Sequence, residues 1–145
     1  MHTVDASVWI SASSPGEREH PVSRAYIDRL AAVRTPIVLP HLAYVEVAAT
    51  ISRIHGDATL GIELANAIAR LPFVTWVTLD GTLALSSASL ANNNRLRGAD
   101  DVYAAVAAEY GCDLVSLDGE HLTRLKSVVR TLTPAAALAT LPPPP

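Results

Sequence analysis

Four acidic residues stand at positions from which their carboxylates can meet at one site. Asp5 ends the first run of strand-forming residues, Asp118 ends a later one, Asp100 opens a helical segment and Glu46 lies inside another. Grouped carboxylates repel one another, and a hard divalent cation such as Mg²⁺ or Mn²⁺ removes that conflict. Such ions can activate water and clamp a phosphodiester for in-line attack. These residue types therefore allow metal-assisted hydrolysis of a phosphodiester bond.

Each of these acids also has a purely structural explanation. Asp5, Asp100 and Asp118 stand at helix starts, where a carboxylate commonly caps the helix. Glu46 lies within an apolar helical segment, where an unpaired carboxylate is costly to bury, and an ion pair with Arg53 two turns later is the alternative. The four acids together are a more specific signal than any one of them.

Alternating strand-like and helix-like segments predict how the acids are positioned. Short runs rich in β-branched residues predict strands at 3–5, 36–39, 74–79, 114–117 and 128–132. Helical patterns predict helices at 20–33, 41–55, 58–70, 82–92, 101–110 and 119–126, with a short last helix opening at Thr133-Pro134. This alternation indicates βαβ units and a parallel sheet, and ligand sites form at the carboxyl ends of parallel strands. We therefore expect the four acids to converge at that edge of the sheet.

Length and composition limit the class of protein. A chain of 145 residues fits one domain, which we assign to residues 1–141, followed by a proline tail at 142–145 that we expect to be disordered. The single cysteine, Cys112, excludes an intrachain disulfide and is expected to be an inert core thiol. The sequence has no signal-peptide pattern and no apolar stretch of membrane-spanning length, so we expect a cytoplasmic protein that makes no membrane contact.

Four short segments that contain the acids resemble the PIN-domain ribonucleases, and among them the VapC-type toxins of type II toxin–antitoxin systems. They are Val4-Asp5-Ala6-Ser7, Tyr44-Val45-Glu46-Val47-Ala48, Leu96-Arg97-Gly98-Ala99-Asp100 and Leu114-Val115-Ser116-Leu117-Asp118. The resemblance implies a three-layer α/β/α sandwich around a central parallel sheet of four to five strands. It also implies a Mg²⁺- or Mn²⁺-dependent endoribonuclease that forms a homodimer and is neutralised by a cognate antitoxin protein.

The resemblance also assigns roles to individual acids. The residues that match the family's acidic site, as catalytic and metal-binding groups, are Asp5, Glu46, Asp100 and Asp118. Asp101 stands where the family usually has a small residue, so it is either a group that supports the ligands or the true ligand in place of Asp100. We assign the ligand role to Asp100 from the preceding Gly98-Ala99.

Other polar residues stand close to the acids in sequence. Ser7 and Ser116 match small hydroxyl residues of the family and could hold a water or a phosphate oxygen, although ordinary helix capping would also explain them. Arg97 is a candidate contact for RNA or for the antitoxin, and a plain solvent-exposed arginine is the alternative. His121 could shuttle protons near Asp118, but a solvent-exposed helix residue is the simpler interpretation.

Charge and aromatic content restrict how RNA would be held. The chain has 14 acidic and 11 basic residues, a net charge of −3, and removing the four proposed site acids leaves 10 against 11. The negative charge is thus concentrated in one site that needs cations before it can meet a phosphate. Aromatic residues make up 5%, too few for a base-stacking platform, which favours RNA held through metal, phosphate and shape.

Two alternative functions come from other classes of protein. One is a catalytically inactive PIN-like binding module, against which the intact set of acids argues. The other is a different phosphoryl-transfer α/β domain. A phosphatase of the haloacid dehalogenase type expects a second Asp where this chain has Ser7, and a receiver domain expects a late lysine, for which Lys126 is poorly placed.

Overall fold

The computed structural model describes residues 1–94 and 100–145, without the side chain of residue 100, and its described part is built around a parallel sheet. Five strands lie in the order β3-β2-β1-β4-β5. They are β1 (His2–Val4), β2 (Ile37–Pro40), β3 (Val74–Val77), β4 (Asp113–Val115) and β5 (Thr131–Leu132). The parallel sheet and its surrounding helices confirm the predicted α/β class.

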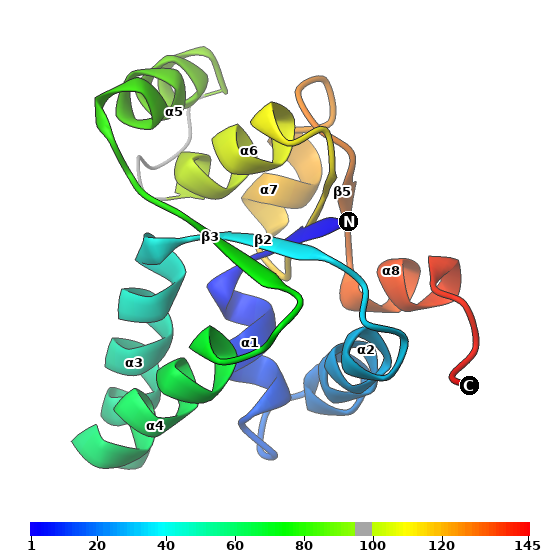
Figure 1. Ribbon diagram of the computed structural model, residues 1–145. Coiled ribbons are helices and arrows are strands. Elements are labelled where there is room, and N and C mark those ends of the chain that lie inside the picture. Colours follow the sequence, from blue (N-terminus) through cyan, green and yellow to red (C-terminus); the bar gives the residue numbers. More distant parts are fainter. Residues whose placement is uncertain (95–99) are drawn as a thin grey trace.

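Helices connect and flank the strands. They are α1 (Ala6–Ala12), α2 (His20–Val33), α3 (His41–His55), α4 (Ala58–Ala69), α5 (Gly81–Asn94), α6 (Asp100–Glu109), α7 (Gly119–Arg124) and α8 (Pro134–Thr140). Figure 1 shows α5 and α6 over one face of the sheet and α1, α2 and the α3–α4 hairpin on the other, which gives the expected three layers. No helix within residues 1–94 and 100–145 is long and apolar enough to cross a membrane.

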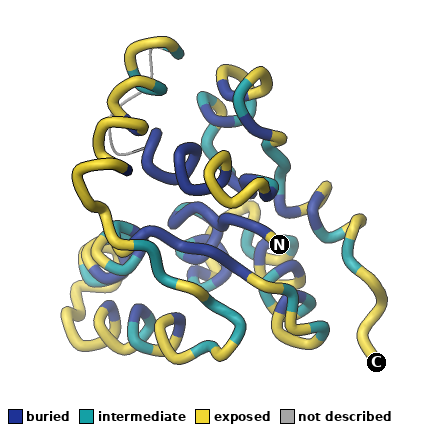
Figure 2. Tube along the Cα trace, turned by 45° about the horizontal axis from the view of Figure 1, so that its top comes forward, coloured by how far each residue is buried: buried dark blue, intermediate teal, exposed yellow. Residues whose placement is uncertain are grey.

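The core lies along the central strands and α6, which are dark blue in Figure 2, whereas much of α5 is exposed. Val4, Leu39, Leu114 and Val115 have no exposed surface. Such nearly all-apolar strands are expected where helices cover both faces of a parallel sheet. Cys112 belongs to this core, as predicted, and its thiol lies 3.3 Å from the Thr3 hydroxyl.

Most element boundaries agree with the sequence-based prediction, and two do not. The predicted helices 20–33 and 41–55 coincide with α2 and α3. The run 128–132 was predicted as one strand, but only its last two residues form β5. The N–H groups of Val128 and Val129 instead donate to Leu125 O at 2.8 and 3.0 Å, so this part of the run closes a turn after α7. The short helix α1 follows Asp5, where the sequence suggested only a capping alternative.

The α3–α4 hairpin is closed by a very tight helix crossing at Gly61. A β-carbon at this position would lie inside van der Waals contact with the Ser52 hydroxyl and the Ala48 carbonyl, and 3.0 Å from the Ser52 backbone nitrogen. The glycine therefore lets α4 approach the α3 backbone directly. This contact matters for the site because α3 carries Glu46.

Candidate active site

Asp5 lies at the carboxyl end of β1, in the middle of the sheet. Its backbone N–H donates to the Val115 carbonyl at 2.9 Å, which fixes the end of β1 beside β4. The Asp5 carboxylate makes no capping bond to α1, although it stands at the N-cap position. Its Oδ2 instead accepts hydrogen bonds from the hydroxyls of Ser7, at 2.7 Å, and Ser116, at 2.6 Å. Helix capping is therefore not the role of this side chain.

The two serine hydroxyls join Asp5 to the loop after β4. Ser7 Oγ accepts from the Leu117 N–H at 3.2 Å, and Ser116 Oγ accepts from the Asp118 N–H at 2.9 Å. Each hydroxyl thus donates to Asp5 and accepts from a backbone N–H of the loop after β4. Residues 111 positions apart in the chain are held at one point of the sheet edge.

His121 is part of the same cluster, and the interpretation as a solvent-exposed residue was wrong. It is 1% exposed, because α7 packs its first turn back toward the sheet edge. Its Nδ1 lies 3.0 Å from Ser116 Oγ and 3.6 Å from Asp5 Oδ2. Its Nε2 is buried and has no hydrogen-bond partner among the residues that the structure describes.

Glu46 reaches the site from α3 and is held by Tyr103 of α6. The Tyr103 hydroxyl donates to Glu46 Oε2 and is itself buried. Burial raises the pKa of the Tyr103 phenol well above its usual value of 10, and the nearby negative charges of Glu46 and Asp5 raise it further. The phenol therefore stays protonated and donates at any pH near neutrality. Both carboxylates lie near one phenol group, as the predicted convergence requires.

Tyr103 is a site residue that the sequence analysis missed. Its position one helical turn after Asp100 was a usable signal, because residues three apart on a helix are neighbours. Tyr103 was overlooked because a tyrosine in an alanine-rich helix reads as ordinary core. The structure places it in the core and at the acidic edge together.

Asp118 stands at the end of the loop after β4 and caps α7. Its Oδ1 accepts from the Glu120 N–H at 2.6 Å, so the capping alternative is present in the structure. The side chain is half-buried and sits two residues from Ser116, whose hydroxyl binds its backbone N–H. Capping uses one carboxylate oxygen and leaves the other outside that bond.

The remaining predicted residues lie at or before the start of α6. Asp100 is the first residue of α6, but its side chain and the whole of Arg97 lie outside the described residues. Asp101 is fully buried. Which of Asp100 and Asp101 is a metal ligand stays a prediction.

The chemistry of the donors fits a hard divalent cation. In the described part of the chain, no three His, Cys, Asp or Glu side chains are grouped closely enough to hold an ion. Asp5, Glu46 and Asp118 nevertheless come to one edge of the sheet, and they offer only carboxylate oxygen, the ligand type that Mg²⁺ and Mn²⁺ prefer.

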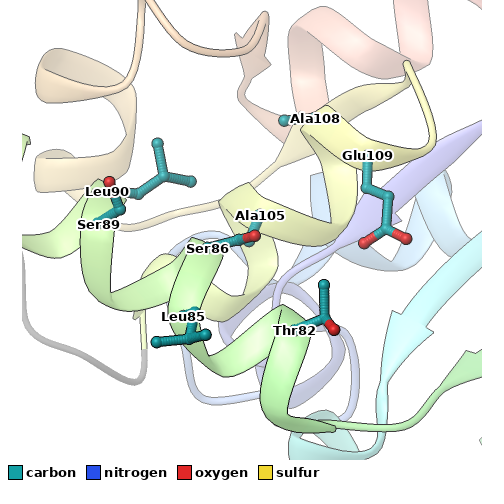
Figure 3. Close-up of a pocket in the computed structure, with 8 residues that line it drawn as sticks. All are labelled: Thr82, Leu85, Ser86, Ser89, Leu90, Ala105, Ala108 and Glu109. Carbon is teal, nitrogen blue, oxygen red and sulfur yellow. The ribbon is translucent and has the colours of Figure 1, made fainter.

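A groove of about 650 Å³ between α5 and α6 is separate from the acidic edge (Figure 3). Its lining residues are Thr82, Leu85, Ser86, Ser89, Leu90, Ala105, Ala108 and Glu109. This lining comes from α5 and the second half of α6, and among the described residues it includes none of the predicted site residues. The groove therefore does not compete with the acidic edge as the candidate for catalysis.

Comparison with known proteins identifies the family. Residues 3–127 match the PIN domain model. No curated protein is significantly similar in sequence. Among solved structures, the chain is similar to VapC20 of Mycobacterium tuberculosis, which is described as a sarcin–ricin loop cleaving toxin. The TM-score is 0.68 at 20% identity, and the match covers 82% of this chain and 91% of that one.

Two further structures are complexes. A toxin–antitoxin complex from Klebsiella pneumoniae gives a TM-score of 0.64 at 16% identity, with 92% of this chain and 98% of that one covered. VapBC2 of Rickettsia felis, bound to a DNA fragment from its promoter, gives a TM-score of 0.66 at 10% identity. The match covers 91% of this chain and 97% of that one. At these low identities the similar structures establish a common fold, and the match to the PIN domain model over residues 3–127 establishes the family. The chain, with its acidic edge at the carboxyl ends of β1 and β4, belongs to the PIN domain family.

Proposed function

We propose that this PIN domain is a VapC-type toxin, a divalent-metal-dependent endoribonuclease that acts in the cytoplasm. The single observation that carries the proposal is the arrangement around Asp5. The carboxylate of Asp5 at the centre of the sheet edge is held by Ser7 and Ser116. The Asp118 N–H binds the same Ser116 hydroxyl, and the Tyr103 phenol that binds Glu46 lies near Asp5 as well. Four carboxylates, Asp5, Glu46, Asp100 and Asp118, would form the catalytic and metal-binding set.

The chain's own residues would hold and orient this set. Bound Mg²⁺ or Mn²⁺ would offset the negative charge of the phosphodiester and activate water for attack. Asp5 accepts both serine hydroxyls through Oδ2, so Oδ1 is the oxygen that would be available to hold the cation. Tyr103 keeps Glu46 in place by donating a proton that it does not lose near neutral pH. These contacts fix two ligands before substrate arrives, as a preorganised site requires.

We assign the ligand role at the start of α6 to Asp100, with Asp101 as a supporting residue. Asp101 has no exposed surface, whereas a ligand of an ion that meets RNA must face the open edge. An Asp100→Asn variant should therefore lose Mn²⁺ affinity, while Asp101→Asn should mainly lower the free energy of unfolding.

We further propose that a cognate antitoxin neutralises the protein and that the toxin forms a homodimer. The similar structures from Klebsiella pneumoniae and Rickettsia felis are described as complexes with antitoxins or with promoter DNA. The α3–α4 hairpin offers an apolar surface to which the antitoxin or a second copy of the chain could bind, because Val45 is 60% exposed and Ile62 is 46% exposed there. Both residues line a groove of about 380 Å³ between these helices.

The test is metal-dependent cleavage of RNA by the purified protein. The substrates are total RNA and a sarcin–ricin loop oligonucleotide, since VapC20 of Mycobacterium tuberculosis is described as cleaving that loop. We expect cleavage with Mg²⁺ or Mn²⁺, none in excess EDTA, and none by Asp5→Asn, which keeps the size and most hydrogen bonds of the side chain. Circular dichroism would establish that the variant is folded.

The same assay separates the alternatives. Undiminished cleavage by Asp5→Asn or in EDTA would refute the metal mechanism. A protein that binds Mn²⁺ and a partner, but cuts no RNA under any condition, would be an inactive PIN-like binding module instead.

A further inference from the structure

We propose that His121 is a positioning residue that sets the direction of the Ser116 hydroxyl and thereby holds Asp5 in the orientation that binds a divalent cation. This inference rests on the proposed function. Neither the family match nor the sequence pattern gave the His121 imidazole a role in metal binding.

The hydrogen-bonding capacity of Ser116 determines which atom donates. A serine hydroxyl has one proton and two lone pairs. An ionised carboxylate can only accept, so the 2.6 Å contact to Asp5 Oδ2 uses the single proton of Ser116. The Asp118 N–H, 2.9 Å away, uses one lone pair. The remaining contact, to His121 Nδ1 at 3.0 Å, therefore requires that Nδ1 carries the proton and donates to the second lone pair.

This arrangement saturates the Ser116 oxygen and leaves its proton no alternative acceptor. If Nδ1 were unprotonated, the hydroxyl could turn toward the ring instead of toward Asp5, because both acceptors lie within hydrogen-bonding distance. With Nδ1 protonated, Ser116 and Ser7 both donate to Asp5 Oδ2. Asp5 Oδ1 accepts neither hydroxyl and is the oxygen that remains for the cation.

The burial of His121 makes this tautomer a property of the fold. The ring is 1% exposed, and within the described residues its Nε2 finds no hydrogen-bond partner. Burying an N–H group that has no acceptor costs more free energy than burying an unprotonated ring nitrogen that has no donor. Burial of Nε2 therefore also favours the tautomer with the proton on Nδ1. The imidazole thus contacts Ser116 and Asp5 through Nδ1 and is not itself one of the proposed metal ligands.

Isothermal titration calorimetry with MnCl₂ alone tests the proposal on purified, folded variants. His121→Leu removes the donor and keeps an apolar side chain, and we expect Mn²⁺ affinity to fall about 10- to 100-fold, the usual effect of losing a group that orients a metal ligand. His121→Asn places an amide N–H near the position of Nδ1, so it should restore most of the affinity. Unchanged affinity in His121→Leu, or equal losses in the Leu and Asn variants, overturns the proposal.

His2→Leu is the matched control. His2 is also a buried imidazole held through Nδ1, by the Tyr26 hydroxyl at 2.8 Å, but it lies at the opposite end of β1. This variant should lose stability and keep the Mn²⁺ affinity of the unaltered protein. A comparable loss of affinity in His2→Leu would attribute the His121 effect to general destabilisation and so overturn the proposal.

A measurement on the unaltered chain does not depend on any variant folding. Two-bond ¹H–¹⁵N correlations of the imidazole rings distinguish a protonated Nδ1 from an unprotonated one. A proton on Nδ1 of His121 supports the network, and an unprotonated Nδ1 overturns it. If the unaltered protein bound no Mn²⁺ and cut no RNA, the proposed function would fail, whereas failure of the inference alone leaves Mn²⁺ binding intact and insensitive to residue 121.

Discussion

Replacing Gly61 by alanine should force the α3–α4 hairpin apart. The new β-carbon would overlap the Ala48 carbonyl and the Ser52 hydroxyl, and would lie 3.0 Å from the Ser52 backbone nitrogen. Two of these three atoms belong to the α3 backbone, which cannot rotate away as a side chain can. The two helices must therefore separate or α3 must bend.

The magnitude follows from two opposing terms. Because backbone atoms stand in the way, overpacking at this position should cost the upper part of the usual range, about 2–3 kcal/mol, while alanine is favoured over glycine inside a helix by about 1 kcal/mol. We expect the free energy of unfolding to fall by about 1–2 kcal/mol. For a chain of this length that corresponds to a loss of roughly 3–7 °C in Tm.

Thermal and urea unfolding followed by circular dichroism measure this effect. Gly81→Ala is the matched control, because a β-carbon at this first residue of α5 meets nothing within 4 Å. Adding Ser52→Ala to Gly61→Ala should recover only part of the loss, since the Ala48 carbonyl still stands in the way. A Gly61→Ala protein as stable as the unaltered chain would refute the close packing of α3 against α4.

Three further predictions concern single side chains. Tyr103→Phe removes the donor to the half-buried Glu46 carboxylate, and we expect the free energy of unfolding to fall by about 2 kcal/mol in urea titrations; no change would mean that Tyr103 does not bind Glu46. Burial lowers the pKa of His2 below its ordinary 6.5, so the unfolded chain takes up more protons than the native one, and stability should fall as the pH drops below 6.5. Urea titrations across this range should show a shallower pH dependence for His2→Leu. Asp57→Ala removes the N-cap of α4, which binds the Thr59 N–H at 2.8 Å, and should cost about 1 kcal/mol, whereas Asp57→Asn should cost less.

Much of the fold could be predicted because the periodicity of the apolar residues and the residues that typically start or end helices agree along most of the chain. The predicted helix 101–110 ends beside Gly111, which has a left-handed φ of 59°, and Thr133 caps α8 through its hydroxyl at the predicted start of that helix. The run 128–132 misled the prediction because β-branched residues fit a buried turn as well as a strand. Val129 is 9% exposed without being part of β5.

The positions of Asp5 and Asp118 in the fold could be predicted from the sequence, whereas the side chains that contact Asp5 and Glu46 were harder to predict. Asp5 and Asp118 were placed correctly at the edge because parallel topology fixes where strands end. His121 was misjudged because its burial depends on how α7 returns to the sheet, which is a tertiary property that no local pattern records. Tyr103 was missed for the same reason, since a helix in another chain could point the same residue into a purely apolar core.

The strand order has a consequence for the synthesis of the protein. β1 is the first strand made, yet it pairs with β4, which is formed by residues 113–115, and its Asp5 is held by Ser116. More than three-quarters of the 145 residues must therefore be translated before the acidic edge can assemble. A nascent or prematurely terminated chain that ends before residue 116 would carry Asp5 without the serine hydroxyl that orients it. Under the proposed function, activity against RNA would therefore appear only when synthesis of the chain is nearly complete.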